Sequence, residues 1–270
     1  MDLVYTATLT LYLLATAAYL AYLIKPSELA GHIARWLVYG GFAIHLTFTL
    51  MRAFAAGHTP ITNLHESLSF FALCIIGTFI VFERKYRLSI LGSFVIPVAL
   101  LIILASVMRP STIVPLNPAL KSQWFAVHTI MAFLGYAMFT IAFGAAVMYL
   151  IQQYLLKNRK LGALYHKLPS LETLDEINYR CLTFGFPLLT FAIISGAIWA
   201  ETAWGTYWSW DPKETWSLIT WFVYAALLHG RLTTGWRGRK AAIFAIIGFM
   251  VLIFTFLGVN LLLPGLHSYN

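Results

Sequence analysis

The sequence predicts an all-α fold, a polytopic membrane helix bundle with about eight transmembrane helices. Of its 270 residues, 60% are hydrophobic and only 10% are charged. The mean hydropathy of +0.77 lies far above the range of a soluble domain. The apolar residues also fall into runs of about 20, the length that a helix needs to cross the hydrocarbon core. We expect spans at residues 3–24, 33–56, 64–82, 89–107, 126–154, 180–201, 215–232 and 241–262.

The basic residues between these spans predict the orientation of the chain. The loops on one side hold 14 of the 18 lysines and arginines, whereas the other side holds only Arg52, Arg109, Lys121 and Lys213. The richer side should face the cytoplasm or its equivalent, because basic loops are retained there. With an even number of spans, both termini then lie on the outer (periplasmic or lumenal) side.

Charge, cysteines and the first apolar run limit the functional class. The net charge of +8 is spread over four loops, which argues against a nucleic-acid partner. Cys74 and Cys181 fall in different spans, so we expect two buried, unpaired thiols. The run at 3–24 has no basic residue before it and is read as a retained helix. We therefore treat 1–270 as a single integral membrane domain.

A tryptophan-rich segment occupies the outer loop at 202–216, between the sixth and seventh spans. Residues 204–216 hold four of the nine tryptophans. An interfacial aromatic belt gathers Trp and Tyr without any ligand, but this density in thirteen residues favours a shelf for a flat ligand. At its end, Asp211, Pro212 and Glu214 have the pattern of a helix start with a capping box. Lys213 beside that N-terminus would suit an anion such as a porphyrin propionate.

Two histidines are expected on the same membrane face as this segment. His128 lies one turn into the fifth span, which runs from outside to inside, and His267 follows the eighth span, which ends outside. Two neutral imidazoles with an aromatic shelf between them is an arrangement that holds an iron porphyrin through its axial positions. An ionisable residue within a span is costly to bury and is therefore a functional candidate by default. His128 is such a residue.

For most of the remaining histidines we expect a structural or a solvated role. His229 lies near the inner end of the seventh span, where it is either an interfacial histidine beside Arg231 or part of a second haem position. His45 is expected to be a satisfied histidine of the bundle interior, and His58 is left open. Asn63 and Glu66 are expected to cap and begin a helix. His32 and His166 are expected to be solvated.

Five stretches of the chain resemble one family. They are WGTYWSWDPKETW at 204–216, GHTPITNLHESL at 57–68, WFAVH at 124–128 followed by FLGYA at 133–137, LHGR at 228–231 and GVNLLLPGLHSY at 258–269. The first resembles the tryptophan-rich WWD signature of haem-handling proteins. Taken in chain order from about residue 57 to the end, the combination is similar to the CcsA (ResC) family of system II cytochrome c biogenesis.

The resemblance implies roles for individual residues. His128 and His267 correspond to two outer-face histidines that ligate haem iron, and His229 to the membrane-embedded ligand of a second haem site. The bound substrate would be haem b, iron protoporphyrin IX. His65 stands where the family has Tyr, and it receives no role; no catalytic residue is assigned. The shelf that would bind the haem consists of Trp204, Tyr207, Trp208, Trp210, Asp211, Lys213 and Trp216.

The resemblance also implies a function and partners. The protein would present haem to apocytochrome c as a subunit of a cytochrome c haem lyase or synthase, with haem translocation as a further expectation. The expected partners are a CcsB-type membrane protein, which supplies the second ligand of the embedded site in fused relatives, apocytochrome c, thiol-reducing pathway proteins and membrane lipid. The loop between the fifth and sixth spans is shorter than in plastid proteins, which favours a bacterial plasma (inner) membrane over a thylakoid.

Three alternatives remain open at this point. They are a haem exporter without a synthase role, a b-type membrane electron carrier and a regulator of haem synthesis. An electron carrier would pair its histidines at matching depths within the spans, whereas His128 and His267 are expected at the outer rim. A regulator would not need that outer pair. The positions of these histidines therefore favour presentation of haem.

Overall fold

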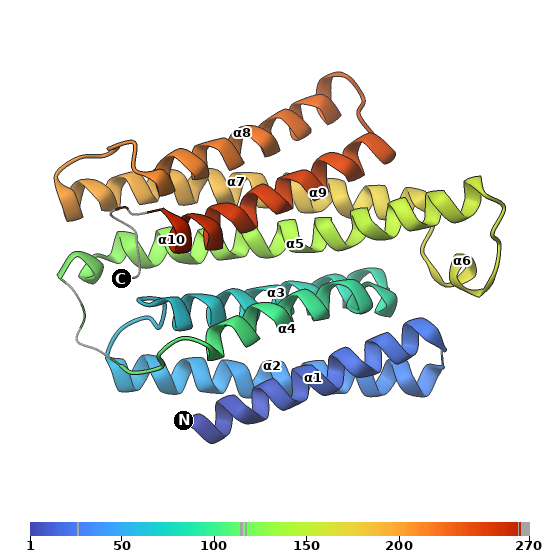
Figure 1. Ribbon diagram of the computed structural model, residues 1–270, viewed down its shortest axis with the longest axis horizontal. Helices are drawn as coiled ribbons and strands as arrows, with labels where there is room; N and C mark the ends of the chain where they lie inside the picture. The colour runs from blue at the N-terminus through green and yellow to red at the C-terminus, as the bar shows by residue number, and fades with distance from the viewer. Residues whose placement is uncertain (26, 114–115, 117, 264, 266–270) are drawn as a thin grey trace. The chain divides into compact units, whose positions relative to one another are not determined.

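The computed structural model describes residues 1–25, 27–113, 116, 118–263 and 265, with backbone alone at 119. Within these ranges the secondary structure is entirely helical (Figure 1), which confirms the predicted all-α bundle. Seven of the described helices are long and apolar enough to cross a membrane. The chain forms two compact units: unit 1 holds Met1–Val114 and Val147–Leu174, and unit 2 holds Pro115–Ala146 and Asp175–Asn270.

The helices divide between the units as follows. Unit 1 contains α1 (Asp2–Ile24), α2 (Glu28–Ala56), α3 (Leu64–Tyr86), η1 (Ser89–Leu91), α4 (Gly92–Val107), the end of α5 (Gln123–Lys157) and α6 (Ala163–Lys167). Unit 2 contains η2 (Pro118–Lys121), most of α5, α7 (Leu171–Trp204) from Asp175 onward, α8 (Pro212–Thr233), α9 (Arg239–Ile253), the π-helical turn η3 (Phe254–Gly258) and α10 (Val259–Leu262).

Each predicted span lies on a helix, but α8 and α7 differ from expectation. The predicted span 215–232 forms α8, whose 22 residues are long enough to cross a membrane but are not among the seven apolar spans. Polar residues such as Thr220 and His229 lower its hydropathy. Helix α7 begins at Leu171, nine residues before the predicted span, because Leu174 and Ile177 give its polar first turns a buried apolar face.

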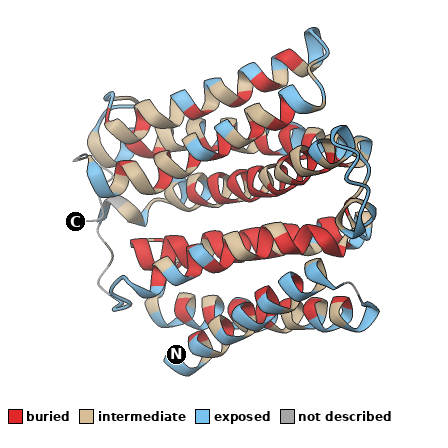
Figure 2. Ribbon diagram, turned by 45° about the vertical axis from the view of Figure 1, so that its right-hand side comes forward, coloured by how far each residue is buried: buried red, intermediate tan, exposed pale blue. Residues whose placement is uncertain are grey.

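The buried face of α1 in unit 1 carries polar side chains. Along α1, the buried residues are Tyr5, Thr8, Tyr12, Ala15, Thr16 and Tyr19, whereas leucines such as Leu3 and Leu13 are exposed. Figure 2 shows this two-sided pattern along the helix that begins at the N-terminus. The pattern is the one expected in lipid, where polar groups must find their partners inside the protein.

Glycines allow the helices of unit 2 to approach closely. A Cβ atom at Gly135 of α5 would lie 3.2 Å from the carbonyl oxygen of Gly185 in α7. Small residues at a crossing let two backbones come together in this way. Nearby, the rings of Phe139 in α5 and Tyr224 in α8 stack with centroids 3.6 Å apart. These contacts hold α5, α7 and α8 as the frame on which the candidate site is built.

Candidate functional site

His128 is held by a hydrogen bond between α5 and α7. Its Nδ1 lies 2.7 Å from the carbonyl oxygen of Ala192. A carbonyl oxygen can only accept, so Nδ1 carries the proton and Nε2 is the proton-free nitrogen of the neutral ring. An imidazole whose other nitrogen donates to a carbonyl is set in the tautomer that ligates metals.

The imidazole ring of His128 also lies against α7 at Gly196, where the helix has no side chain. A Cβ atom at Gly196 would lie 2.6 Å from Nδ1 and 2.9 Å from Cε1 of His128. The indole of Trp199 is nearly parallel to the imidazole, at an interplanar angle of 19° with centroids 6.1 Å apart. Ala192, Gly196 and Trp199 follow at i, i+4 and i+7, which places them on one face of α7. This face forms a cradle for His128.

An aromatic cluster connects His128 with the predicted shelf. Trp199 packs edge-on against Trp204 with centroids 4.8 Å apart, and Phe125 lies 5.0 Å from Trp199. His128 and Trp204 thus both pack against Trp199, and their place on the outer membrane face stays a prediction. Ala192, Gly196 and Trp199 were not predicted from the sequence. The signal that could have identified them is their i, i+4, i+7 spacing near the end of the sixth span, which places them on one helix face.

The loop between α7 and α8 is organised by Glu214. Its Oε2 accepts hydrogen bonds from the backbone N–H of Ser209 at 2.8 Å and of Asp211 at 3.2 Å. The side chain of Asp211 in turn accepts from the N–H of Lys213 at 3.0 Å. The predicted N-cap and capping box are thus confirmed. Trp210 adopts a left-handed conformation with φ of 59°, which turns the chain sharply before the helix.

The rings of the tryptophan-rich segment differ in exposure. Tyr207 is 60% exposed and Trp210 is 69% exposed, whereas Trp208 is half-buried and meets Trp210 edge-on. Trp216 instead packs against Phe254 at 4.5 Å between centroids. Tyr207 and Trp210 therefore present a large area that the described protein does not cover, while Trp216 helps to join α8 to η3.

Lys213 connects the start of α8 to the π-helical turn. Its Nζ donates to the carbonyl oxygen of Phe256 at 3.3 Å and lies 5.4 Å from the centre of the Phe256 ring. The side chain precedes the predicted span, and burial lowers the pKa of Lys213 to about 7, although the carboxylate of Asp211 opposes this shift. The amine thus has a partner within unit 2, and a role in binding an anion stays a prediction.

The C-terminal segment returns to the same end of unit 2. A Cβ atom at Gly265 would lie 2.5 Å from Oδ1 of Asp211, so the backbone passes directly over the capping residue of α8. The predicted ligand His267 lies outside the described residues. The described chain thus ends beside the tryptophan-rich segment.

His229 lies at the opposite end of unit 2 from His128. It is exposed on α8, in a stripe with Ile219, Phe222 and Ala226. Two residues further, Arg231 binds Asp175 near the start of α7 with a bidentate ion pair at 3.1 and 2.8 Å. About 26 Å of helix separates Asp175 from Ala192, beside which His128 lies.

The other sequence predictions fall mainly in unit 1. His45 is bonded through both ring nitrogens, which confirms a satisfied interior histidine. Asn63 accepts from the N–H of Glu66 and caps α3 as predicted. The two cysteines are buried and unpaired. Among the described residues, no three His, Cys, Asp or Glu side chains converge on a point that could hold a metal ion.

Fold and site together define a class, a polytopic helical membrane protein with a histidine–tryptophan site at one end of a helical unit. Comparison with known proteins places it further: the chain belongs to the cytochrome C assembly protein family, whose model matches residues 61–267. The predicted resemblance to the CcsA family is thereby confirmed, and cytochrome c biogenesis is the function of that family.

Individual relatives support the same assignment. The chain is 42% identical over 247 residues to the cytochrome c biogenesis protein CcsA of Guillardia theta, covering 83% of this chain and 82% of the relative. It is 42% identical over 267 residues to CcsA of Prochlorococcus marinus (strain NATL1A), covering 88% and 84%. Its fold resembles the cytochrome c haem lyase CcmF with a TM-score of 0.72 at 21% identity. That match covers 95% of this chain and 46% of CcmF.

Proposed function

We propose that unit 2 binds haem b at the outer membrane face and presents it for covalent attachment to apocytochrome c. The observation that carries this proposal is the geometry of His128. Its Nδ1–H is committed to the Ala192 carbonyl, so its Nε2 has the chemistry of an axial iron ligand. The protein acts here by holding its substrate in position, and it would be a subunit of a haem lyase or synthase.

The tryptophan-rich segment supplies the second part of the site. Tyr207 and Trp210 expose rings that a flat porphyrin would cover, and such exposure of large aromatic side chains is typical of a binding surface. In this proposal His267 is the opposite axial ligand. Gly265 supports that role, because it lies against Asp211 only two residues before His267. The N-terminus of α8 and Lys213 would receive the propionates.

The attachment step depends on position. Each of the two thiols of a Cys-x-x-Cys-His motif adds across one haem vinyl group: a C–S bond forms, and the thiol hydrogen goes to the neighbouring vinyl carbon. Holding the haem with its vinyl groups toward both thiols makes this reaction effectively intramolecular. On transfer, the histidine of the substrate motif would displace one of the two ligands from this chain.

The exposed histidine of α8 supports the need for a membrane partner. In a lipid-facing position His229 would be costly, and α8 is the least apolar of the long helices. We propose that a CcsB-type protein covers this face and completes a second haem site there. Both termini would lie on the outer side, and the membrane would be a bacterial plasma membrane or, as the alternative, a thylakoid.

Haem translocation is a second candidate function. His229 and His128 mark opposite ends of unit 2, which is the arrangement expected if haem passes from an inner to an outer site. Labelled haem would be supplied to the inner membrane face of sealed vesicles that contain the protein and its partner. If translocation occurs, the label should accumulate at the outer membrane face. A transfer rate equal to that of protein-free vesicles would exclude this function while leaving presentation intact.

The proposal is tested by removing each ligand separately. The full chain would be purified with its partner as wild type, His128→Ala, His267→Ala and His229→Ala. We expect the two outer variants to lose the spectrum of the outer haem and to abolish cytochrome c assembly. His229→Ala should reduce total haem content but leave the outer spectrum in the residual haem.

His32→Ala is the matched control, because His32 is an exposed histidine at the start of α2 in unit 1. It should behave like the wild type in both assays. Unchanged haem spectra in His128→Ala and His267→Ala, with normal cytochrome c assembly, would show that the ligand assignment is wrong.

A further inference from the structure

Unit 1 contains a buried ion pair in which both carboxylate oxygens have hydrogen-bond partners but one nitrogen of the guanidinium has none among the described residues. Nε of Arg52 donates to Oε1 of Glu66 at 2.7 Å, and both side chains are almost completely buried. The other oxygen of Glu66 accepts from the N–H and the hydroxyl of Thr62, both at 2.9 Å. Nη2 of Arg52 is buried and has no hydrogen-bond partner within the described residues. A buried cationic donor in this state requires an acceptor.

A second hydrogen-bonded group lies deeper in the same unit. His45, at the middle of α2, contacts the hydroxyl of Tyr12 through Nδ1 at 3.2 Å and that of Ser69 through Nε2 at 2.9 Å. Tyr5 of α1 lies next to this group, with its ring centroid 6.3 Å from that of His45 and 5.2 Å from that of His65 in α3. Ser69 is the member of the hydrogen-bonded group that lies on α3, the helix that also carries Glu66.

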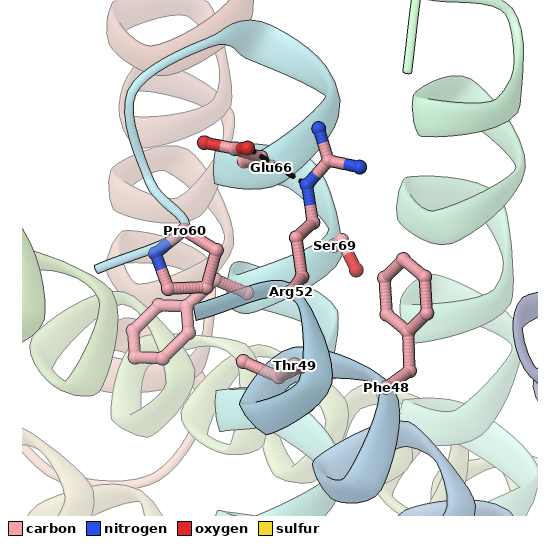
Figure 3. A pocket seen from close by; sticks show the side chains of 7 residues that line it. Phe48, Thr49, Arg52, Pro60, Glu66 and Ser69 are labelled. Carbon is pink, nitrogen blue, oxygen red and sulfur yellow. Dashed lines mark hydrogen bonds and ion pairs between the residues drawn. The ribbon is translucent and has the colours of Figure 1, made fainter. Parts of the chain in front are cut away.

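A hollow joins the two groups. It is an open space of about 190 Å³ whose lining includes Arg52, Glu66, Ser69 and Pro60, and its enclosed part has about the size of one water molecule. Figure 3 shows the amino nitrogens of Arg52 on the side of the guanidinium away from Glu66, with Ser69 next to the arginine side chain. Pro60 belongs to the loop 57–63, so the hollow lies at the end of the unit where this loop joins α2 to α3.

We propose that this hollow is a water site, and that the water completes a hydrogen-bonded path from loop 57–63 to His45. The water would accept from Nη2 of Arg52 and bond to the hydroxyl of Ser69. The path then runs from Thr62 through the ion pair of Arg52 and the water to Ser69, His45 and Tyr12.

His65 supports a hydrated interior at this depth. Its Nδ1 donates to the carbonyl oxygen of Ser106 at 2.9 Å, so its Nε2 is an acceptor. That atom is buried and has no hydrogen-bond partner among the residues described. Ordered water is the usual partner of such orphaned polar atoms inside proteins. The water would then link the ion pair of Arg52 and Glu66 to the hydrogen-bonded group of His45.

Silver ions test the path, because Ag⁺ is small enough to follow water and binds thiolates. Membranes containing the full chain with the substitution Ser69→Cys would be exposed to Ag⁺. After denaturation, the remaining thiols would be labelled with N-ethylmaleimide and quantified by mass spectrometry. We expect Cys at position 69 to be protected at least about tenfold faster than the native Cys74, which is buried in the same helix.

Leu68→Cys is the matched control, because Leu68 is equally buried at the same depth of α3 but is not part of the hollow. Protection of Leu68→Cys should be as slow as that of Cys74. Equal protection rates for Ser69→Cys and Leu68→Cys would overturn the proposal. As a second measurement on the unmodified chain, a density map that resolves waters should show a peak bonded to both Nη2 of Arg52 and Oγ of Ser69; a dry hollow would refute the site.

Discussion

Two histidines, His45 of unit 1 and His128 of unit 2, differ in how deeply they are buried. In unit 1, His45 is completely buried and has a protein partner at each nitrogen. In unit 2, His128 has its Nδ1 fixed by Ala192, and His229 is exposed on α8. Two aromatic side chains show the same contrast, since Tyr12 is buried in unit 1 while Trp210 is mostly exposed in unit 2.

This difference separates structural from binding chemistry. A buried polar side chain with protein partners mainly specifies how its helices pack, and removing one partner leaves the other unsatisfied. The Nδ1–H of His128 is held by a backbone carbonyl, which sets its Nε2 in the acceptor form that a metal ligand has, and the exposed rings of Tyr207 and Trp210 suit an external ligand. Substitutions in unit 1 should therefore affect stability first, and those in unit 2 should affect haem.

The largest expected effect comes from breaking the ion pair of unit 1. Arg52→Met or Glu66→Gln leaves one buried charge without its partner, which should destabilise the fold by about 3–5 kcal/mol. Thermal unfolding of the detergent-solubilised protein, followed by circular dichroism, measures this loss. The double variant Arg52→Met/Glu66→Leu should recover much of the stability. Single variants that unfold at the wild-type temperature would contradict the assigned structural role.

A smaller effect is expected at the cradle of His128. In Gly196→Ala the new methyl group would occupy the position of the imidazole ring, so the ring must move and its bond to Ala192 is lost. Haem affinity should fall about 10- to 100-fold, as is typical when the residues that orient a ligand are changed. Titration of the apoprotein with haem measures the affinity. Gly40→Ala is the control, since no atom lies within 4 Å of the added Cβ.

If Gly196→Ala binds haem as tightly as Gly40→Ala, the cradle does not position the ligand. A loss of thermal stability without a loss of haem affinity would assign Gly196 to helix packing alone. Either result would mean that this part of α7 has a structural role and does not position haem.

The last expected effect is a pH dependence of stability at Lys213. Its pKa is 10.5 when unperturbed and about 7 in the folded protein, so between these values the unfolded chain binds more protons. The free energy of unfolding should therefore rise with pH across this window and stay level below it. The difference in melting temperature between wild type and Lys213→Met should change in that direction. Lys121→Met, at an exposed lysine of η2, should show no such dependence.

A melting difference between wild type and Lys213→Met that is the same across the window would mean that the amine is not buried in the folded state. A difference that appears only when haem is bound would instead favour contact between Lys213 and a propionate.

The fold was largely predictable because its signals are local. A run of about 20 apolar residues is a helix in lipid regardless of its neighbours, and all eight predicted spans became helices. The start of α8 was predictable for the same reason, since Asp211 and Glu214 make their bonds within a few residues. The early start of α7 was missed because Leu174 and Ile177 are buried by tertiary packing that hydropathy does not report.

The site was predictable only in part. Span counting predicted that His128 and the tryptophan-rich segment share one membrane face, because parity alone decides the face. The cradle could not be predicted, since Ala192 contributes a backbone carbonyl and Gly196 contributes the absence of a side chain. Neither has a chemical signature in the sequence, and both lie more than 60 residues from His128. The contact of Lys213 with the carbonyl oxygen of Phe256 likewise depends on η3, a π-helical turn that could not be predicted from the composition.

The most direct test of the central claim is the absorption spectrum of haem in His128→Gly, recorded with the partner protein and with added imidazole. The claim is that Nε2 of His128 ligates the iron. The spectrum of the outer haem should change in the variant and should return to the wild-type form when free imidazole enters the vacated position. A spectrum that is unchanged by the substitution, or that imidazole does not restore in a folded variant, would contradict the assignment.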